Sequence, residues 1–227
     1  MKLLAVDSAA SLCAACIWDT QARRELGRSV VDIGKGHAER LMATIAEALA
    51  AAGSDYADLG ALAVSTGPGS FTGVRVGVST VRGLALALKI PAVGVTTLDA
   101  VAAEARTDFP DRPIMVAIDA GRGDLYVALY NVSGEMSYDA CVLNFADALA
   151  LAVETAPVLC GTAAAQIADA AAPLAFDMGP AIATADIATY AMLAADRGPS
   201  TERPKPVYLR EPDAKPQAGF ILPRSRS

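Results

Sequence analysis

The sequence is short of histidine and of charge. His37 is the only histidine among 227 residues, so a metal site built on a pair of histidines is excluded and one candidate imidazole base remains. Charged residues make up 19% of the chain, below the usual share of roughly a quarter. No run of 18 apolar residues is free of a charge or a helix breaker, which predicts no transmembrane helix and no contact with a membrane.

Acidic charge outweighs basic charge, and the excess is unevenly distributed. The net charge of −6 argues against a chain that grips nucleic acid by itself, because phosphate binding needs a basic face. Residues 203–227 nevertheless carry six basic and two acidic side chains. Such a tail suits contact with RNA or a solvated end, and we favour the solvated end. Asp7 comes too early for a secretory signal peptide, so we expect a cytoplasmic protein.

The four cysteines are not expected to bind metal or to form a disulfide. Cys13 and Cys16 form a C-x-x-C pattern inside the apolar run Leu12–Trp18, which is typical of a strand. Residues three apart on a strand point to opposite faces, so these two thiols cannot share a metal ion or form a redox pair. Buried apolar packing is therefore the expected role of both. Cys141 and Cys160 are far away in sequence.

A glycine-rich stretch, Ser65–Gly77, leads from a predicted strand into a long apolar helix, Val74–Leu88. A strand, a glycine loop and a helix N-terminus can together hold an anion. The alternative is a tight turn that needs glycine only for its backbone geometry. Thr72 is the expected N-cap of the helix. The candidate phosphate-binding residues in this stretch are Gly67, Gly69 and Ser70.

Two helices, Gly36–Ala52 and Val74–Leu88, are predicted in the N-terminal half. The second is apolar or small over most of its circumference, because its polar side chains fall on one narrow stripe. We expect a sheet to cover one side of it, and the first helix or another protein to cover the other. The residues expected at a protein–protein contact are His37, Leu41, Val74, Val78, Val81 and Ala85.

The pattern that opens the chain returns at its middle. Lys2–Asp7 and Ile114–Asp119 are both predicted to be buried strands that end in an acid and are followed by a small turn and a second strand. Pro110 and Pro113 mark a boundary between the two halves. We therefore expect a duplicated α/β fold, with an N-terminal domain at residues 1–108, a smaller repeat domain at 109–198 and a proline-rich basic tail at 199–227.

The remaining elements are predicted from apolar runs and periodicity. The further strands are Leu12–Trp18, Glu25–Val31, Gly60–Ser65, Ala92–Val95, Ser137–Leu143 and Val158–Cys160. The further helices are Thr97–Glu104 with Thr97 as its cap, Phe145–Ala152, Ala163–Ala172 and Ile182–Asp196. Prolines keep the tail out of regular structure, and Tyr208 and Leu209 are expected to anchor it. Whether the last helix packs on the first or the second domain stays open.

Three motifs together resemble those of one protein family. In the order of the chain they are G-H-A-E-R-L at Gly36–Leu41, G-P-G-S-F-T-G-V-R-V-G at Gly67–Gly77 and P-V-Y-L-R-E-P-D-A-K-P at Pro206–Pro216, and they resemble the TsaB family, also called YeaZ. The resemblance covers essentially the whole chain. It implies a duplicated, ribonuclease H-like two-domain fold of the actin/sugar-kinase/Hsp70 type, and kinship with glycoprotease homologues.

The resemblance implies a non-catalytic subunit in tRNA modification. Members of the family pair with TsaD, the catalytic subunit that transfers a threonylcarbamoyl group to adenosine 37 of tRNAs reading codons that begin with A. An ATPase, TsaE, joins that complex. On this basis tRNA is an indirect partner and no cofactor is required. The two helices described above are the family's dimer contact, so homodimers would compete with the heterodimer.

This sequence departs from the patterns of TsaD and of the actin/sugar-kinase/Hsp70 superfamily, as expected of a chain without catalytic activity. TsaD holds a metal with two histidines spaced H-x-x-x-H, whereas here Leu41 stands four residues after His37. The first phosphate turn, D-S-A-A at Asp7–Ala10, lacks the glycine of the pattern D-x-G-T. Weak binding of ATP or ADP with magnesium stays open, because two carboxylates across a cleft can hold a magnesium nucleotide. The candidate residues for it are Asp7, Ser8 and Asp119.

Two other functions remain open. An autonomous nucleotide-binding kinase or ATPase of the same fold needs Asp7 and Asp119 to face a nucleotide across a cleft. A glycoprotease-like peptidase needs Ser70 as nucleophile and His37 as base, and nothing in the sequence brings these two together. The sequence also does not identify the residues that touch TsaD, or whether RNA contacts this subunit.

Overall fold

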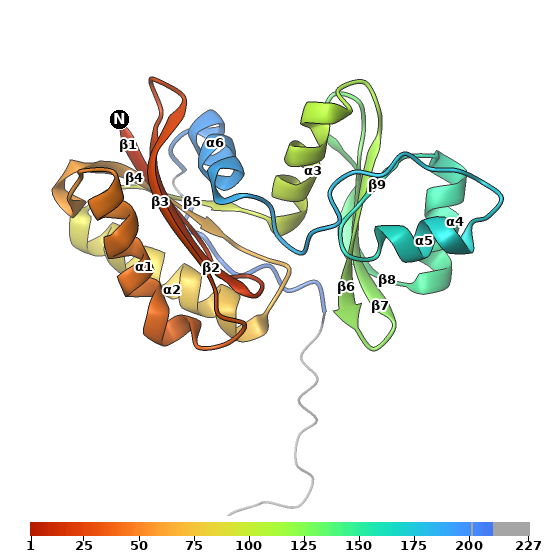
Figure 1. The fold of residues 1–227 in the computed structure, drawn as a ribbon, viewed down its shortest axis with the longest axis horizontal. Helices are drawn as coiled ribbons and strands as arrows, with labels where there is room; N and C mark the ends of the chain where they lie inside the picture. Colours follow the sequence, from red (N-terminus) through yellow and green to blue (C-terminus); the bar gives the residue numbers. More distant parts are fainter. Residues whose placement is uncertain (201, 211–227) are drawn as a thin grey trace, which may run out of the picture.

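The computed structural model describes residues 1–200 and 202–210 and shows an α/β protein with two β-sheets (Figure 1). Sheet A has the strand order β3-β2-β1-β4-β5, and sheet B has the order β8-β7-β6-β9. The strands of sheet A are β1 (Lys2–Asp7), β2 (Leu12–Asp19), β3 (Arg24–Asp32), β4 (Leu59–Ser65) and β5 (Ala92–Val95). Those of sheet B are β6 (Ile114–Gly121), β7 (Asp124–Tyr130), β8 (Met136–Asn144) and β9 (Val158–Cys160).

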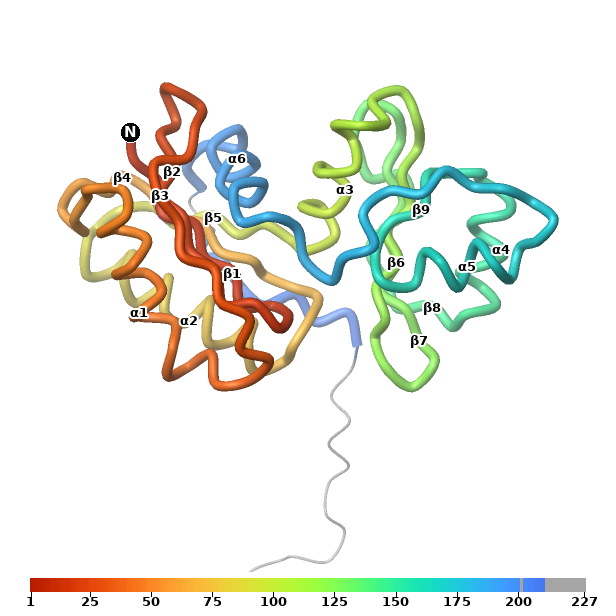
Figure 2. The backbone as a smooth tube through the Cα atoms, viewed as in Figure 1, coloured from red at the N-terminus to blue at the C-terminus, as the bar shows by residue number. Residues whose placement is uncertain are grey.

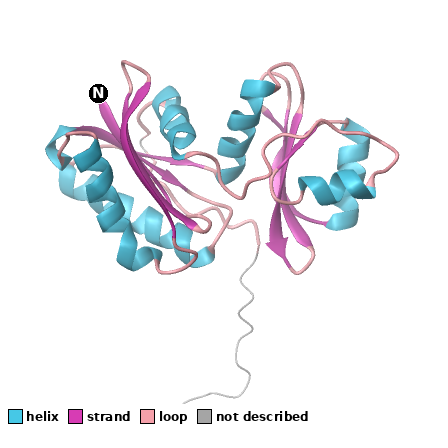
Figure 3. Cartoon of the chain, viewed as in Figure 1, coloured by secondary structure: helices cyan, strands magenta, loops and turns pink. Residues whose placement is uncertain are grey.

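Helices cover both faces of each sheet (Figure 3). On sheet A, α1 and α2 lie on the outer face and α6 on the inner face; on sheet B, α4 and α5 lie on the outer face and α3 on the inner face. The helices are α1 (His37–Ala51), α2 (Phe71–Leu88), α3 (Thr97–Asp108), α4 (Phe145–Thr155), α5 (Ala164–Ala170) and α6 (Ile187–Arg197), with a short 3₁₀ turn, η1 (Tyr56–Asp58), before β4.

The two sheets repeat one topology, which confirms the predicted duplicated fold. In each sheet a central strand pairs antiparallel with the strand that comes after it and parallel with a strand after the next helix. The central strands are β1 and β6. The second copy is the smaller one, since α5 has seven residues where the corresponding α2 has 18, and, among the described residues, a single parallel bridge from Leu159 of β9 to Met178 stands in the place of β5.

Alternation along the strands of sheet A divides its apolar residues between two cores. Leu4 and Val6 pack under α1 and α2, whereas Leu3 and Ala5 face the inner layer with α3 and α6. Cys13 lies in the first of these cores and Cys16 in the second, so the predicted opposite orientation of the C-x-x-C thiols is confirmed.

The last helix returns to the first sheet. Figure 2 shows the chain leaving α5 at the far end of sheet B and running back to α6, which packs on β1 and β2. Ile187 and Tyr190 of α6 are buried in the same core as the inner face of sheet A. The sequence left open where this helix packs; in the structure α6 covers the second face of sheet A, although it falls within the expected second domain, residues 109–198.

Three helices differ from the prediction in their cap or, by more than one residue, in their first residue. Helix α2 begins at Phe71 rather than Val74, and its cap is Ser70, whose hydroxyl accepts from the Gly73 amide, in place of Thr72. Helix α3 is capped by Thr96, whose hydroxyl accepts from the Asp99 amide, in place of Thr97. The last helix begins five residues later than expected, at Ile187. In each case a side chain just before the helix satisfies the free amides of the first turn.

Among the described residues one helix, α2, is long and apolar enough to cross a membrane by length and composition alone. Composition alone is weak support for a span, because core helices of soluble proteins pass the same test. Helix α2 lies against β4 and β1, and Arg75, Arg82 and Lys89 are exposed along it or at its cap. Charged side chains at such positions oppose insertion into a bilayer.

Candidate functional site

The first turn, residues 8–11 between β1 and β2, is packed onto the start of α2. A Cβ atom added at Gly73 would lie 2.0 Å from the carbonyl oxygen of Ser8, and one added at Gly69 would lie 2.2 Å from that of Ala9. Only glycine allows an approach this close. The Ser8 hydroxyl donates to the carbonyl oxygen of Gly73 over 2.9 Å, and the Ser70 amide donates to that of Ala9 over 2.6 Å.

The backbone groups of the glycine loop are thus hydrogen-bonded to, or in close contact with, other backbone groups of the protein. Gly67 has φ 85°, in the left-handed region, and its carbonyl oxygen accepts from the Thr97 amide over 2.8 Å. Ser70 is occupied as the cap of α2. The arrangement favours the alternative interpretation of the loop, a tight turn, over the phosphate cradle.

Asp7, at the end of β1, is a buried carboxylate with protein partners on both oxygens. Only 1% of the residue is exposed. One oxygen accepts from the Ala9 amide over 2.9 Å, and the other accepts from the Thr184 hydroxyl over 2.5 Å. The Thr184 hydroxyl lies 2.9 Å from the hydroxyl of Tyr190, which donates because the one proton of Thr184 goes to Asp7. Burial raises the pKa of the Tyr190 phenol. Asp7 is therefore tied to the segment that leads into α6.

The second turn, defined here as residues 119–124 and so including the last residues of β6 and the first of β7, is open in comparison. Asp119 is exposed, and one of its carboxylate oxygens accepts from the Gly121 amide over 2.7 Å. Gly121, Arg122 and Gly123 all have positive φ, and a Cβ added at either glycine would meet no atom within 4 Å. The structure does not place Asp119 opposite an accessible second carboxylate, because its counterpart, Asp7, is buried.

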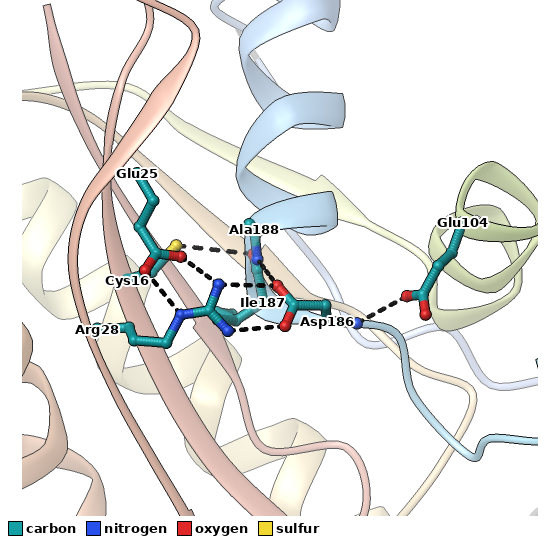
Figure 4. A network of polar contacts seen from close by, with 7 residues as sticks. All are labelled: Cys16, Glu25, Arg28, Glu104, Asp186, Ile187 and Ala188. Carbon is teal, nitrogen blue, oxygen red and sulfur yellow. Dashed lines mark hydrogen bonds and ion pairs between the residues drawn. The ribbon is translucent and has the colours of Figure 1, made fainter. Parts of the chain in front are cut away.

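A charged network attaches α6 to sheet A (Figure 4). The guanidinium of Arg28 on β3 lies between the carboxylates of Glu25 and Asp186 and bonds to both, at 2.5–2.7 Å and 2.7–3.2 Å. These bonds raise the pKa of Arg28. Burial alone would raise the pKa of Asp186, but bonds from Arg28 and the Ala188 amide outweigh it and hold that pKa below its ordinary value. Glu104 of α3 accepts from the Asp186 amide over 2.9 Å.

Most residues expected at a protein–protein contact lie inside the chain's own core. Val78 is 2% exposed and Val81 is fully buried against sheet A, together with Val74 and Leu41. The prediction of these four as partner contacts is corrected, because the β-branched face of α2 packs on the sheet. Ala85 is half-buried.

His37 is buried at the start of α1, and its Nε2 lies 3.1 Å from the carbonyl oxygen of Leu12, which can only accept. This nitrogen therefore carries a proton and is not a free base. Ser70 bonds to the Gly73 amide instead of to His37. No hydrogen bond in the described part of the chain joins the two residues that a peptidase would need, and His37 is also removed from the expected partner contact.

A different face of the two outer helices is exposed. On α2, Gly83 and Ala87 are exposed, and a Cβ added at Gly83 would meet no atom within 4 Å. On α1, Ala38, Met42 and Ala46 are exposed, with Met42 at 47%. These five residues, named here the α1–α2 face, are small or apolar, and sequence periodicity alone could not separate them from the buried row.

The first part of the tail is packed on the body of the protein, which corrects the expectation of a solvated end for residues 202–210. The Val207 amide donates to the carbonyl oxygen of Thr66 over 2.8 Å, and Leu209 packs against the inner core. Arg210 reaches the second turn, where it donates to the carbonyl oxygens of Ala120 and Gly121 over 3.2 Å and pairs with Asp124. The expected anchoring role of Leu209 is confirmed. Residues 211–227 lie outside the described part of the chain.

Tyr208 is the second tail anchor. Its hydroxyl accepts from Nε of Arg75 over 2.8 Å, and its ring centroid lies 6.1 Å from that of Phe71. The Arg75 guanidinium lies 3.5 Å from the centroid of the Phe71 ring. Tyr208 is therefore held at the start of α2, which confirms the predicted anchoring of the tail; the place of the anchor was not predicted. The role of Phe71 and Arg75 in holding it had no signal in the sequence beyond their residue types.

No group of three or more histidine, cysteine, aspartate or glutamate side chains suited to a metal ion occurs within residues 1–200 and 202–210.

Comparison with known sequences identifies a consistent set of relatives. A family described as "TsaD: tRNA N6-adenosine threonylcarbamoyltransferase" matches residues 32–195. The Escherichia coli "tRNA threonylcarbamoyladenosine biosynthesis protein TsaB" is 35% identical over 133 residues, which are 57% of this chain and 55% of that protein. An uncharacterized protein of Mycobacterium tuberculosis is 33% identical over 217 residues, 95% of each chain. The match thus spans only about half the length of the E. coli relative.

Solved structures give the same fold over almost the whole chain. The structure of YeaZ from Pseudomonas aeruginosa superposes with a TM-score of 0.72 at 26% identity, and the match covers 92% of this chain and 99% of that one. The ethanolamine utilization protein EutJ from Carboxydothermus hydrogenoformans, at 12% identity and a TM-score of 0.50, shares the fold alone.

Proposed function

This chain belongs to the family described as tRNA N6-adenosine threonylcarbamoyltransferase, and within it to the TsaB/YeaZ proteins of tRNA threonylcarbamoyladenosine biosynthesis, and from this premise we propose that it is a non-catalytic subunit. In this proposal it binds and supports a TsaD catalytic subunit that transfers threonylcarbamoyl to adenosine 37 of tRNAs reading codons that begin with A. A TsaE-type ATPase completes the complex. The chain is cytoplasmic and requires no cofactor of its own.

The observation that carries the non-catalytic role is the closure of the first turn. In a nucleotide-binding protein of this fold the acid at the end of β1 faces the phosphates and their magnesium ion. Here Asp7 is buried, and Thr184 and the Ala9 amide occupy its oxygens. Gly69 and Gly73 let the first turn pack directly on the glycine loop and the start of α2, so the protein's own backbone occupies this side of the loop. This supports a subunit that keeps the fold and has lost the chemistry.

The α1–α2 face supports the partner-binding role. On α1, Glu47 bonds to Ser29 of β3 and so marks the side away from α2, whereas Ala38 and Met42 lie nearly opposite, because successive residues turn by about 100°. Gly83 and Ala87 extend this apolar surface onto α2. Small residues let another backbone approach closely, and an exposed apolar patch on paired helices is typical of an interface.

A reconstitution experiment tests the proposal. We expect Met42→Glu to weaken binding to the TsaD-family protein of the same organism at least tenfold, because a carboxylate would be desolvated at the contact (about 1.4 kcal/mol per tenfold). The matched control is Val153→Glu on α4, a site with 45% exposure in the second unit. Binding is measured by titration of the purified proteins.

The same proteins, with the TsaE-type ATPase, are then given unmodified tRNA, ATP and an activated threonylcarbamoyl donor prepared beforehand. Threonylcarbamoyladenosine should form with the wild-type chain and with Val153→Glu, and much less with Met42→Glu or without this chain. Equal binding by both variants would remove the α1–α2 face from the proposal. Turnover of ATP by the isolated chain would favour the alternative, an autonomous kinase or ATPase.

A further inference from the structure

We propose that the other flank of α2, together with the described part of the tail, is a direct contact surface for the phosphate backbone of tRNA. This rests on the proposed function only for the choice of tRNA as the RNA. The flank carries Arg75, Arg82 and Lys89, which are seven residues apart. Seven residues are two helical turns, so successive cations lie on one side of the helix about 10 Å apart.

Two pockets continue this line of cations onto the tail. One of about 280 Å³ lies between α2 and the tail and is lined by Arg82, Lys89 and Arg203 among others. The other, of about 610 Å³, adjoins it and is lined by Arg203, Lys205 and Arg197. Both pockets are lined by the tail segment around Pro204, so cationic side chains lie on both sides of this segment.

The charges of this surface are largely unneutralised. Within the described residues, no carboxylate forms an ion pair with Arg75, Arg82, Lys89, Arg203 or Lys205. Arg197 pairs with Asp99, and Glu202 is the acid that lines the two pockets. A concentration of positive charge on a chain of net charge −6 needs an anionic partner. Cations spaced along about 20 Å of helix suit a chain of phosphates better than a single small anion.

Exposed aromatic rings stand at the start of the same flank. Phe71 is 57% exposed and Tyr208 is 55% exposed, and the guanidinium of Arg75 holds the pair in place. Rings exposed among arginine and lysine side chains are the usual stacking platform for unpaired bases, whose faces every nucleotide offers. This combination favours RNA over an acidic protein, which would use the cations but not the flat rings.

The surface is separate from the α1–α2 face. Gly83 comes after Arg82 and Ala87 after Leu86, so each is rotated by about 100° from a residue that lines the first pocket. A protein partner on one flank of α2 and RNA on the other can therefore bind together.

Direct binding of RNA tests the proposal on the full-length chain alone. The probe is a fluorescently labelled, unmodified tRNA transcript, and its anisotropy is followed at salt concentrations between about 50 and 200 mM. We expect the double variant Arg82→Glu/Lys89→Glu to bind at least tenfold more weakly, and its plot of log affinity against log salt to be shallower by about two, one for each lost phosphate contact. If the charge reversal disturbs folding, the neutral double variant Arg82→Gln/Lys89→Gln takes its place, and we expect it to weaken tRNA binding as well.

The matched control is Arg24→Glu/Lys35→Glu, which reverses two exposed charges, one on the edge strand β3 and one in the loop before α1. Tyr208→Leu at the aromatic pair should lower affinity about tenfold and leave the salt slope unchanged, because stacking releases no counterions.

Two results would overturn the proposal: unchanged tRNA affinity of the folded double variant, and an equal loss of affinity in the control. If the double variant keeps its tRNA affinity but loses binding to the TsaD-family partner, the flank is a contact for a protein. Since tRNA binding is measured without the partner, failure of the proposed partner role leaves this result interpretable.

Discussion

Asp7 ends β1 and Asp119 lies two residues before the end of β6, at matching places in the two central strands, and their surroundings are opposite. The first turn is buried between β1 and the start of α2, and Asp7 has protein partners on both oxygens. The second turn is exposed, and Arg210 reaches it from the tail. One topology has thus produced a closed turn in one half and an open turn in the other.

The difference lies in the helix that comes after the fourth strand of each half. In the first half this helix is α2, with 18 residues and with glycines at positions 69, 73 and 77 that admit the turn. In the second half it is α5, with seven residues, which leaves the second turn without a helix across it. The length of the helix that follows the fourth strand is thus enough to make a turn closed or open on one topology.

The closest approach in the first turn should give the largest effect. We expect Gly73→Ala to lower the free energy of unfolding by about 3 kcal/mol, because its methyl group would meet the backbone oxygen of Ser8 at 2.0 Å. Gly83→Ala, on the same helix but with open space around it, should raise it by about 0.5–1 kcal/mol through helix propensity. Urea denaturation measures both. Equal stability of the two variants would show that the turn does not depend on glycine at position 73.

Neutralising Asp7 and Asp119 should lower the free energy of unfolding by different amounts, and this difference should be smaller than that between the two glycine variants. Asp7→Asn should cost about 2 kcal/mol, because the buried bond from Thr184 would lose its charged acceptor. Asp119→Asn should change stability by less than about 0.5 kcal/mol, since that carboxylate is exposed. Thermal and urea unfolding of both variants at neutral pH provide the comparison. A larger loss for Asp119→Asn would reverse the assignment of closed and open turns.

The tail contact of the second turn should give the smallest effect. Arg210→Ala should lower the free energy of unfolding by about 1 kcal/mol, because the guanidinium joins two carbonyl oxygens and Asp124 at once. The control is Arg112→Ala, whose ion pair with Asp177 is more exposed and should contribute less than about 0.5 kcal/mol. If the two losses are indistinguishable in urea titrations, the tail does not stabilise the second turn.

Sequence reasoning was strongest where a local pattern decides the structure. The repeat of a buried strand ending in Asp7 and in Asp119 predicted the duplication, and the spacing of Cys13 and Cys16 predicted their opposite faces. Both depend on a two-residue period that no distant contact alters.

Sequence patterns predicted least where two faces of one helix are both apolar or small. Helix α2 offers an apolar row and a small row, and the sequence alone did not say which row meets the sheet. The β-branched row with Val74, Val78 and Val81 fills the core, since larger apolar side chains gain more from burial. The position of α6 was equally unpredictable, because its cover of sheet A depends on contacts across more than 150 residues.

Because α6 packs back on sheet A, the inner face of that sheet stays uncovered for a time during synthesis of the chain. The strands of sheet A are complete once residue 95 has emerged, but the helix that covers their inner face ends at residue 197. At typical rates of 5–20 residues per second, that apolar face waits roughly 5–20 s for its cover. The first half therefore cannot reach its final core on its own while the ribosome is still at work, and a chain cut at the midpoint would leave Leu3 and Ala5 without the Ile187 and Tyr190 that share their core.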